Sequence, residues 1–145
     1  MRTKLRNTIG CYVDCSAYSA DSCNRGIIEF AAFYGFDYDP LPRASSADYS
    51  EALSWVADES VDFLNSADDP DITPAYAYWT IEDNSLFLLP DIESARENVD
   101  FISSKNADYP PAEFRGPWLH VSDHGNCTLY ERTANDTDFE IWSVV

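Results

Sequence analysis

The stretch SSADYSEALSWVADESVDFLNS, residues 45–66, carries the clearest structural signal in this chain. At about 100° per residue, a set of mostly apolar side chains gathers within an arc of about 120°. Such an arc is the buried stripe of an amphipathic helix. It contains Tyr49, Ala52, Leu53, Val56, Ser60, Phe63 and Leu64. We therefore predict a helix over about residues 47–65, capped by Ser45 or Ser46.

The opposite face of this helix combines carboxylates with one large apolar side chain. Trp55 falls in the middle of five acidic residues that extend over about 21 Å of helix. They are Asp48, Glu51, Asp58, Glu59 and Asp62. No basic residue lies between Arg43 and Arg96, so cationic partners at i,i+4 are absent. An exposed tryptophan within a charged rim has the composition of a binding hot spot. The alternative is a solvated acidic face, with Trp55 packed under a neighbouring loop.

Further acidic residues follow the helix in the segment SADDPDI. Asp68, Asp69 and Asp71 are the next candidates for contacts with a partner. Other acidic clusters occur in GFDYDP, IEDN, PDIESARENVD and NDTDFE, mostly at expected turns. The acids are therefore not confined to one helix.

The charge balance narrows the classes of partner. The chain has 145 residues, of which 45% are hydrophobic, so it can bury a core and is not a disordered acidic tail. Its 26 acidic and 9 basic residues give a net charge of −17, well beyond the magnitude of about 2–8 that solubility requires. Such a surface repels nucleic acid and anionic membranes and attracts basic proteins. We expect no direct binding to nucleic acid or membrane.

The remaining pattern predicts an α+β fold, a single domain of residues 1–145 with about three helices on an antiparallel sheet. Asn24 or Ser22 should cap the first helix and Gly35 should end it. The elements expected besides the helix at 47–65 are a strand at 8–14, a helix at 24–34, a hairpin of 75–80 and 84–89 around IEDN, a third helix with Pro90 near its first turn, and three strands within 118–145 with turns at DHGN and TANDTD.

The termini and cysteines bear on the compartment. MRTKLR is basic, but the segment after it lacks the apolar run of a secretory signal, and no stretch approaches the 18 apolar residues of a membrane span. We therefore expect a cytoplasmic location. Free buried thiols are the favoured state of the cysteines, over disulfides or a zinc site. These are Cys11, Cys15, Cys23 and Cys127.

In its acidic charge, small size and aromatic content, the chain resembles DNA-mimic inhibitors encoded by phages and plasmids. These include antirestriction proteins, anti-CRISPR proteins and uracil-DNA glycosylase inhibitors. The resemblance is one of character, spread over residues 37–140, and no motif aligns residue by residue. The ending DHGNCTLYERT…FEIWSVV is also similar to the C-termini of small phage and plasmid proteins. The resemblance implies an origin in a phage or plasmid, a location in the host cytoplasm and no particular fold.

The leading hypothesis is a non-enzymatic inhibitor, without cofactor or metal, that occupies the nucleic-acid site of a CRISPR effector, a restriction enzyme or another nuclease. One alternative is an interaction domain that captures a basic protein without competing with nucleic acid. A second is a protein adapted to a salt-rich cytoplasm. A third is a small enzyme or metal-dependent protein built on His120, Asp123 and His124. An exposed Trp55 would also suit a homodimer interface.

Overall fold

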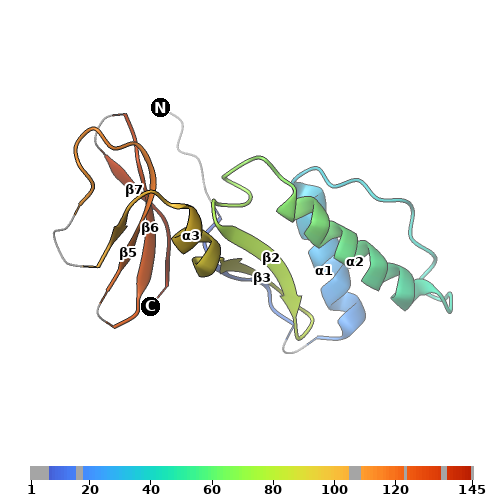
Figure 1. Cartoon of the computed structure of the whole chain (residues 1–145). Coiled ribbons are helices and arrows are strands. Elements are labelled where there is room, and N and C mark those ends of the chain that lie inside the picture. Colours follow the sequence, from blue (N-terminus) through green and yellow to red (C-terminus); the bar gives the residue numbers. More distant parts are fainter. Residues whose placement is uncertain (1–6, 16–17, 105–108, 123, 135–136, 145) are drawn as a thin grey trace. The chain divides into compact units, whose positions relative to one another are not determined.

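The computed structural model describes residues 7–15, 18–104, 109–122, 124–134 and 137–144. The chain forms two compact units (Figure 1). Unit 1 comprises Met1–Thr73 and Tyr78–Leu89, and unit 2 comprises Pro74–Ala77 and Pro90–Val145. No helix in the described part of the chain combines the length and the apolar composition that a membrane span requires.

Unit 1 contains two helices and a three-stranded sheet. Its strands are β1 (Gly10–Val13), β2 (Ala77–Glu82) and β3 (Ser85–Pro90), in the spatial order β1-β3-β2. The β2–β3 hairpin turns at Asp83 and Asn84, which both have positive φ. Two such residues form the tight turn whose twist matches that of the strands it joins, and Asn and Asp tolerate it best. The predicted hairpin is confirmed.

Helix α1 (Ala20–Phe33) begins earlier than the sequence predicts. The cap is Ser19, whose hydroxyl accepts a hydrogen bond from the Ser22 backbone N–H, so Asn24 and Ser22 were the wrong candidates. Asn24 and Ser22 stand close to the apolar stretch of α1, but the helix begins before that stretch, at Ala20. Gly35 follows the helix with φ +103°, and its role in ending the helix is confirmed.

Helix α2 (Tyr49–Asn65) matches the predicted helix closely. Its N-cap residue is Asp48, so the predicted caps Ser45 and Ser46 are wrong by a few residues. The Ser46 hydroxyl instead accepts a hydrogen bond from the Asp48 backbone N–H, in the turn that precedes the helix. The buried side of α2 consists of Leu53, Ala57, Ser60 and Leu64. The Ser60 hydroxyl is satisfied by the Val56 carbonyl oxygen at 2.7 Å.

An aromatic cluster joins α1 to the sheet of unit 1. The Trp79 ring lies 4.9 Å from the Tyr12 ring and 5.2 Å from the Phe30 ring, measured between centroids. The end of α2 is fixed to β2 by Asn65, whose side-chain amide bonds both the N–H and the carbonyl of Trp79. Because β2 lies at an edge of its sheet, Asn65 takes the place of a neighbouring strand at this residue.

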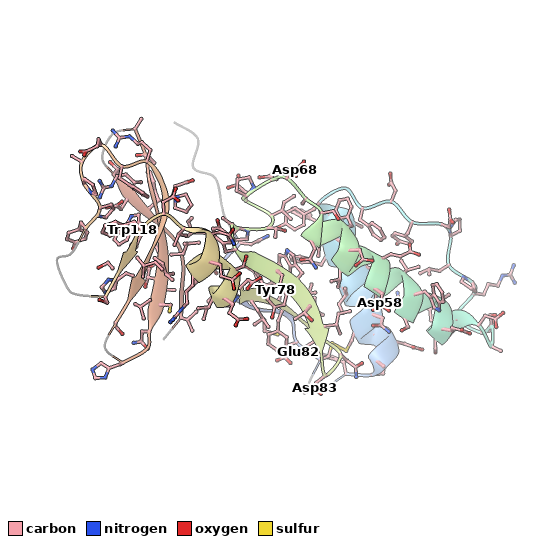
Figure 2. All side chains as sticks on the ribbon, viewed as in Figure 1. Asp58, Asp68, Tyr78, Glu82, Asp83 and Trp118 are labelled. Carbon is pink, nitrogen blue, oxygen red and sulfur yellow. A yellow bond between two sulfur atoms is a disulfide. The ribbon has the colours of Figure 1, made fainter. Side chains whose placement is uncertain are left out.

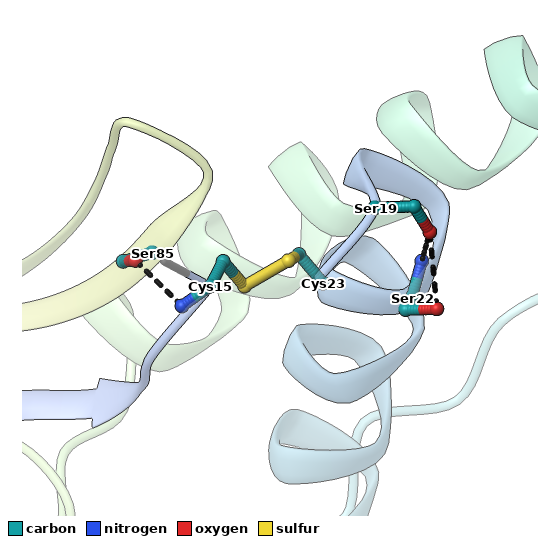
Figure 3. The surroundings of a disulfide bond; sticks show 5 residues. All are labelled: Cys15, Ser19, Ser22, Cys23 and Ser85. Carbon is teal, nitrogen blue, oxygen red and sulfur yellow. Dashed lines mark hydrogen bonds between the residues drawn. A yellow bond between two sulfur atoms is a disulfide. The ribbon is translucent and has the colours of Figure 1, made fainter. Parts of the chain in front are cut away.

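A disulfide between Cys15 and Cys23 joins the segment after β1 to the first turns of α1 (Figure 3). The Cys15 backbone N–H donates to the Ser85 hydroxyl of β3 at 2.9 Å. The expectation of free thiols is therefore wrong for this pair. Cys15 follows β1 and Cys23 lies near the start of α1, so the two Cα atoms are 5.7 Å apart although the residues are eight apart in sequence. Cys11 is a free, exposed cysteine and Cys127 a free, buried one.

Unit 2 contains a short helix and a four-stranded sheet. Helix α3 (Ile92–Asn98) is capped by Asp91, whose carboxylate accepts from the Ser94 backbone N–H. The strands follow in the spatial order β4-β5-β6-β7. They are β4 (Ile102–Ser103), β5 (Gly116–Val121), β6 (Cys127–Arg132) and β7 (Asp138–Val144). The last three are the predicted C-terminal strands. The turns at DHGN and TANDTD fall partly outside the described residues.

The interior of unit 2 contains the Trp118 indole and an ion pair between Arg132 and Asp138. Trp118 stacks on Tyr130 with 4.7 Å between ring centroids, and its indole N–H donates to the Asp138 carboxylate. Arg132 binds the same carboxylate through Nε at 2.7 Å and through a terminal nitrogen at 3.1 Å. Arg132 is 7% exposed, and it also donates to the Pro111 carbonyl oxygen. This charge therefore has a bidentate partner.

The α+β class with three helices is confirmed. The strands are divided between two sheets, and β4 pairs with β5 in parallel. The two-residue strand β4 was not predicted, because so short a segment has no detectable alternation. Pairing partners that lie far apart in sequence leave no local pattern, so the division into two sheets follows only from the folded chain.

Candidate functional site

The acidic face of α2 is the candidate site whose predicted residues all lie exposed on one element of the structure. We define the α2 acidic face as the six side chains predicted from the sequence. They are Asp48, Glu51, Trp55, Asp58, Glu59 and Asp62, and all six are exposed. Asp48 is the N-cap residue and the other five lie within the helix, so one rigid element positions the set.

Trp55 is the most unusual member of the α2 acidic face. Its side chain is 66% exposed, so the alternative in which a loop covers the indole is wrong. At i±3 and i±4 spacing its charged neighbours on the helix surface are Glu51, Asp58 and Glu59. An indole in this setting offers apolar area and an N–H donor within a ring of negative charge.

Two carboxylates of this face, Asp58 and Asp62, lower the stability of α2, whereas Glu51 lies in the first turn, where the helix dipole favours negative charge. Asp58 and Asp62 stand at i,i+4. A pair of like charges at that spacing lowers the stability of a helix by about 0.2–0.5 kcal/mol. Asp62 is also near the C-terminus of the helix, where the dipole disfavours negative charge, and the last turn contains no basic residue. In the described part of the chain, none of the five carboxylates forms a salt bridge. At Asp58 and Asp62, the unmatched charge is thus maintained against the preference of the helix.

The three acids after α2 differ from one another in the structure. Asp68 and Asp69 are exposed, whereas Asp71 is half-buried. The Asp69 carboxylate accepts from the Asp71 backbone N–H at 2.9 Å, and the Asp71 carbonyl oxygen accepts from Asn7 at 3.0 Å. Asp68 and Asp69 therefore extend the exposed charge beyond the helix, while Asp71 has a role in holding the loop.

Another exposed aromatic side chain among carboxylates lies on the β2–β3 hairpin and was missed from the sequence. Tyr78 is 41% exposed, and strand alternation places it on the same side of β2 as Glu82, opposite the buried Trp79. Asp83 adds a carboxylate at the tip of the hairpin. Figure 2 labels these residues together with Asp58 on α2 and Asp68 in the loop that follows it. The sequence signal for this surface is the alternation of side chains in AYWTIE, residues 77–82, which places Tyr78 and Glu82 on one side of the strand.

The charge of unit 1 is strongly one-sided. Residues 7–73 and 78–89 contain 15 acidic residues and 2 basic residues, which gives a net charge of −13. From residue 44 to residue 89 there are ten acidic residues and no basic one. A cationic surface that approaches this unit is therefore attracted at long range, and the attraction weakens as salt screens it.

The histidine segment of unit 2 does not form a comparable site in the described residues. The His120 ring Nδ1 lies 3.3 Å from the Ser103 hydroxyl, while His124 is exposed in the turn between β5 and β6. Cys127 is buried, and its thiol contacts the Gly125 carbonyl oxygen at 3.9 Å. Asp123, the third member of the predicted set, lies outside the described residues. No group of three or more metal-ligating side chains occurs in the part of the chain that is described.

Comparison of the chain with protein-family models, with curated proteins and with solved structures finds no match.

Proposed function

We propose that the protein is an acidic inhibitor whose α2 acidic face binds a basic nucleic-acid-binding site and excludes DNA from it. The observation that carries this proposal is a set of five exposed carboxylates around Trp55 on one rigid helix, none of which forms a salt bridge within the described part of the chain. These carboxylates have no cationic partner among the described residues, and Asp58 and Asp62 disfavour their own helix, which supports a basic partner outside the chain. CRISPR effectors and restriction enzymes are the proposed targets, because both hold DNA in basic clefts.

The spacing of the carboxylates supports imitation of DNA. One DNA strand presents a phosphate about every 3.4 Å, and α2 presents five carboxylates over about 21 Å. This array is slightly sparser than a phosphate strand. Trp55 adds packing area that phosphates lack, so the contact is expected to keep some affinity when salt screens the charges.

Displacement of DNA from purified targets tests the proposal. A restriction enzyme and a CRISPR effector are each bound to a labelled duplex, and fluorescence anisotropy follows the addition of this protein. We expect it to displace the duplex at about 50 mM salt and to do so less well at about 300 mM. Binding to a target that still holds its DNA would instead identify a domain that captures basic proteins. Failure to bind either target at low salt would contradict the proposal for both classes.

The double substitution Asp58→Lys with Asp62→Lys tests the face itself. We expect displacement of the duplex to weaken at least tenfold, because two attractive charges become repulsive. The free energy of unfolding should stay the same or rise, because lysine at position 62 suits the dipole near the helix C-terminus and stands at i,i+3 from Glu59, while the like-charge pair at 58 and 62 only changes sign.

The matched control for this test changes the net charge equally in unit 2. Glu97→Lys with Glu113→Lys alters two exposed acids outside the α2 acidic face. Displacement should then change by less than about threefold at moderate salt. If both double variants lose activity equally, total charge rather than this face determines binding.

A further inference from the structure

A hollow of about 380 Å³ lies in unit 1 between α1 and the segment that leads into α2. Figure 1 shows that segment as the long loop that leaves the end of α1 and turns back into the start of α2. Ile28, Leu41, Pro42 and Tyr49 provide apolar lining, and Tyr38 contributes a second phenol ring. The hollow is distinct from the α2 acidic face, since none of the six residues of that face lines it.

Two opposite charges line this hollow without neutralising each other. Arg25 and Glu29 stand one turn apart on α1, and both are exposed. Among the described residues, neither forms a salt bridge within 4.0 Å. The order of the two residues contributes to this, since a base that precedes an acid at i,i+4 is the weaker arrangement on a helix. Both charges thus remain available to a ligand.

The surrounding field restricts the charge of that ligand. The net charge over residues 7–73 and 78–89 is −13, so unit 1 repels free anions. The Arg25 guanidinium, however, favours an anionic group on the ligand. A ligand that carries a cationic group beside its anionic group avoids this repulsion and matches Glu29 as well. The Cβ atoms of residues at i,i+4 lie about 6 Å apart, so the two side chains can reach both charged groups on one carbon atom.

The size and lining of the hollow restrict the rest of the ligand. Its volume is at the small end of the roughly 300–1,000 Å³ range of ligand pockets. The side chains of Ile28, Leu41 and Pro42 favour an apolar group over a polar one. We propose that the hollow binds a free apolar α-amino acid. Its carboxylate contacts Arg25, its ammonium contacts Glu29, and its side chain packs on the apolar lining.

Titration of ¹⁵N-labelled protein with L-leucine and L-phenylalanine tests the proposal. We expect saturable shifts of backbone amide signals in α1 and in residues 36–49, with a dissociation constant in the millimolar range. N-Acetyl-L-phenylalanine lacks the ammonium group and L-phenylalaninamide lacks the carboxylate. Each should bind at least tenfold more weakly than L-phenylalanine, because one charge-assisted contact is lost.

Substitutions assign the two charged contacts. Arg25→Met and Glu29→Gln should each weaken binding of L-phenylalanine about tenfold. Arg43→Met is the matched control, because Arg43 is the other basic residue among residues 7–89 and does not line the hollow. The amide spectrum of each variant shows whether it is folded.

Two outcomes would overturn the proposal. One is the absence of saturable shifts up to about 20 mM amino acid. The other is equal binding of L-phenylalaninamide and L-phenylalanine, which would indicate general attraction of cations. Neither outcome bears on displacement of DNA by the α2 acidic face, so the two proposals succeed or fail separately.

Discussion

Single side chains explain where this protein exposes apolar surface and where it buries charge. Trp55 is exposed among carboxylates in unit 1, whereas Arg132 is buried against Asp138 in unit 2. In each case, the neighbouring side chains determine whether the group has a partner within the protein. The indole lacks an aromatic partner among the described residues, and the guanidinium has a bidentate one.

Replacement of Trp55 by alanine should affect binding far more than stability. Truncation of an aromatic hot spot typically costs about 2 kcal/mol of binding, which corresponds to roughly a thirtyfold loss of affinity. The free energy of unfolding should change by less than about 0.5 kcal/mol, because the side chain is 66% exposed. Displacement of DNA and urea denaturation measure the two effects. Phe33→Ala, at an apolar residue 82% exposed on α1, is the control. If both variants lost the same binding affinity, any exposed aromatic ring would support binding equally well.

Asp138 should make unit 2 sensitive to acid. Burial alone would raise the pKa of Asp138, but hydrogen bonds from Arg132 and Trp118 and the charge of Arg132 outweigh it and lower the pKa. A carboxyl whose pKa is lower in the folded state contributes stability above its unfolded pKa of about 3.9. This contribution is lost as the pH falls through the folded pKa.

Asp138→Asn tests this linkage. At pH 7 we expect a loss of about 2–4 kcal/mol in the free energy of unfolding, because Arg132 remains buried without its counter-charge. The difference between wild type and variant should begin to narrow below about pH 4, where the carboxyl of the unfolded chain becomes protonated, and should narrow further as the pH falls to the lower pKa of the folded state. Urea denaturation followed by circular dichroism at pH 7 and pH 3 measures it. A difference that is equal at both pH values would contradict the assigned role of the carboxylate.

At the scale of elements, the Cys15–Cys23 disulfide connects β1 with α1. Closing a loop of this length reduces the entropy of the unfolded chain and stabilises the fold by about 2.5 kcal/mol. We expect the double substitution Cys15→Ala with Cys23→Ala to lower the free energy of unfolding by about 2.5 kcal/mol. Reduction of the wild type should have the same effect. Urea denaturation with and without dithiothreitol measures it, and Cys11→Ala is the control. A wild-type midpoint that does not respond to the reductant would indicate that the pair is not bonded in solution.

At the scale of the whole molecule, the net charge of −17 determines the response to salt. Self-repulsion weakens as salt screens it, so the thermal midpoint should rise modestly between about 20 mM and 0.5 M salt. We expect the protein to remain folded in dilute buffer, because α1, α2 and both sheets have buried apolar side chains. Circular dichroism over this range measures the effect. Loss of the helical signal in dilute buffer would favour the alternative of a protein adapted to a salt-rich cytoplasm.

Several features of the candidate site follow from the sequence because they are local. The 3.6-residue periodicity of residues 49–65 predicts both the buried stripe and the exposed carboxylates. The segment IEDN, residues 81–84, predicts the hairpin turn, and Gly35 predicts the end of α1. In each case the residues that interact, or that share a face, are neighbours in sequence.

The remaining features depend on residues that meet only when the chain folds. The Cys15–Cys23 bond requires the direction in which α1 leaves the sheet, and the Asn65 contact with Trp79 requires α2 to end beside β2. The hollow beside Arg25 and the division of the strands into two sheets also have no local pattern. The sequence by itself determined which surfaces are charged and which are apolar, since periodicity encodes them. Only the tertiary structure decided which distant groups become partners, because that depends on how the elements pack.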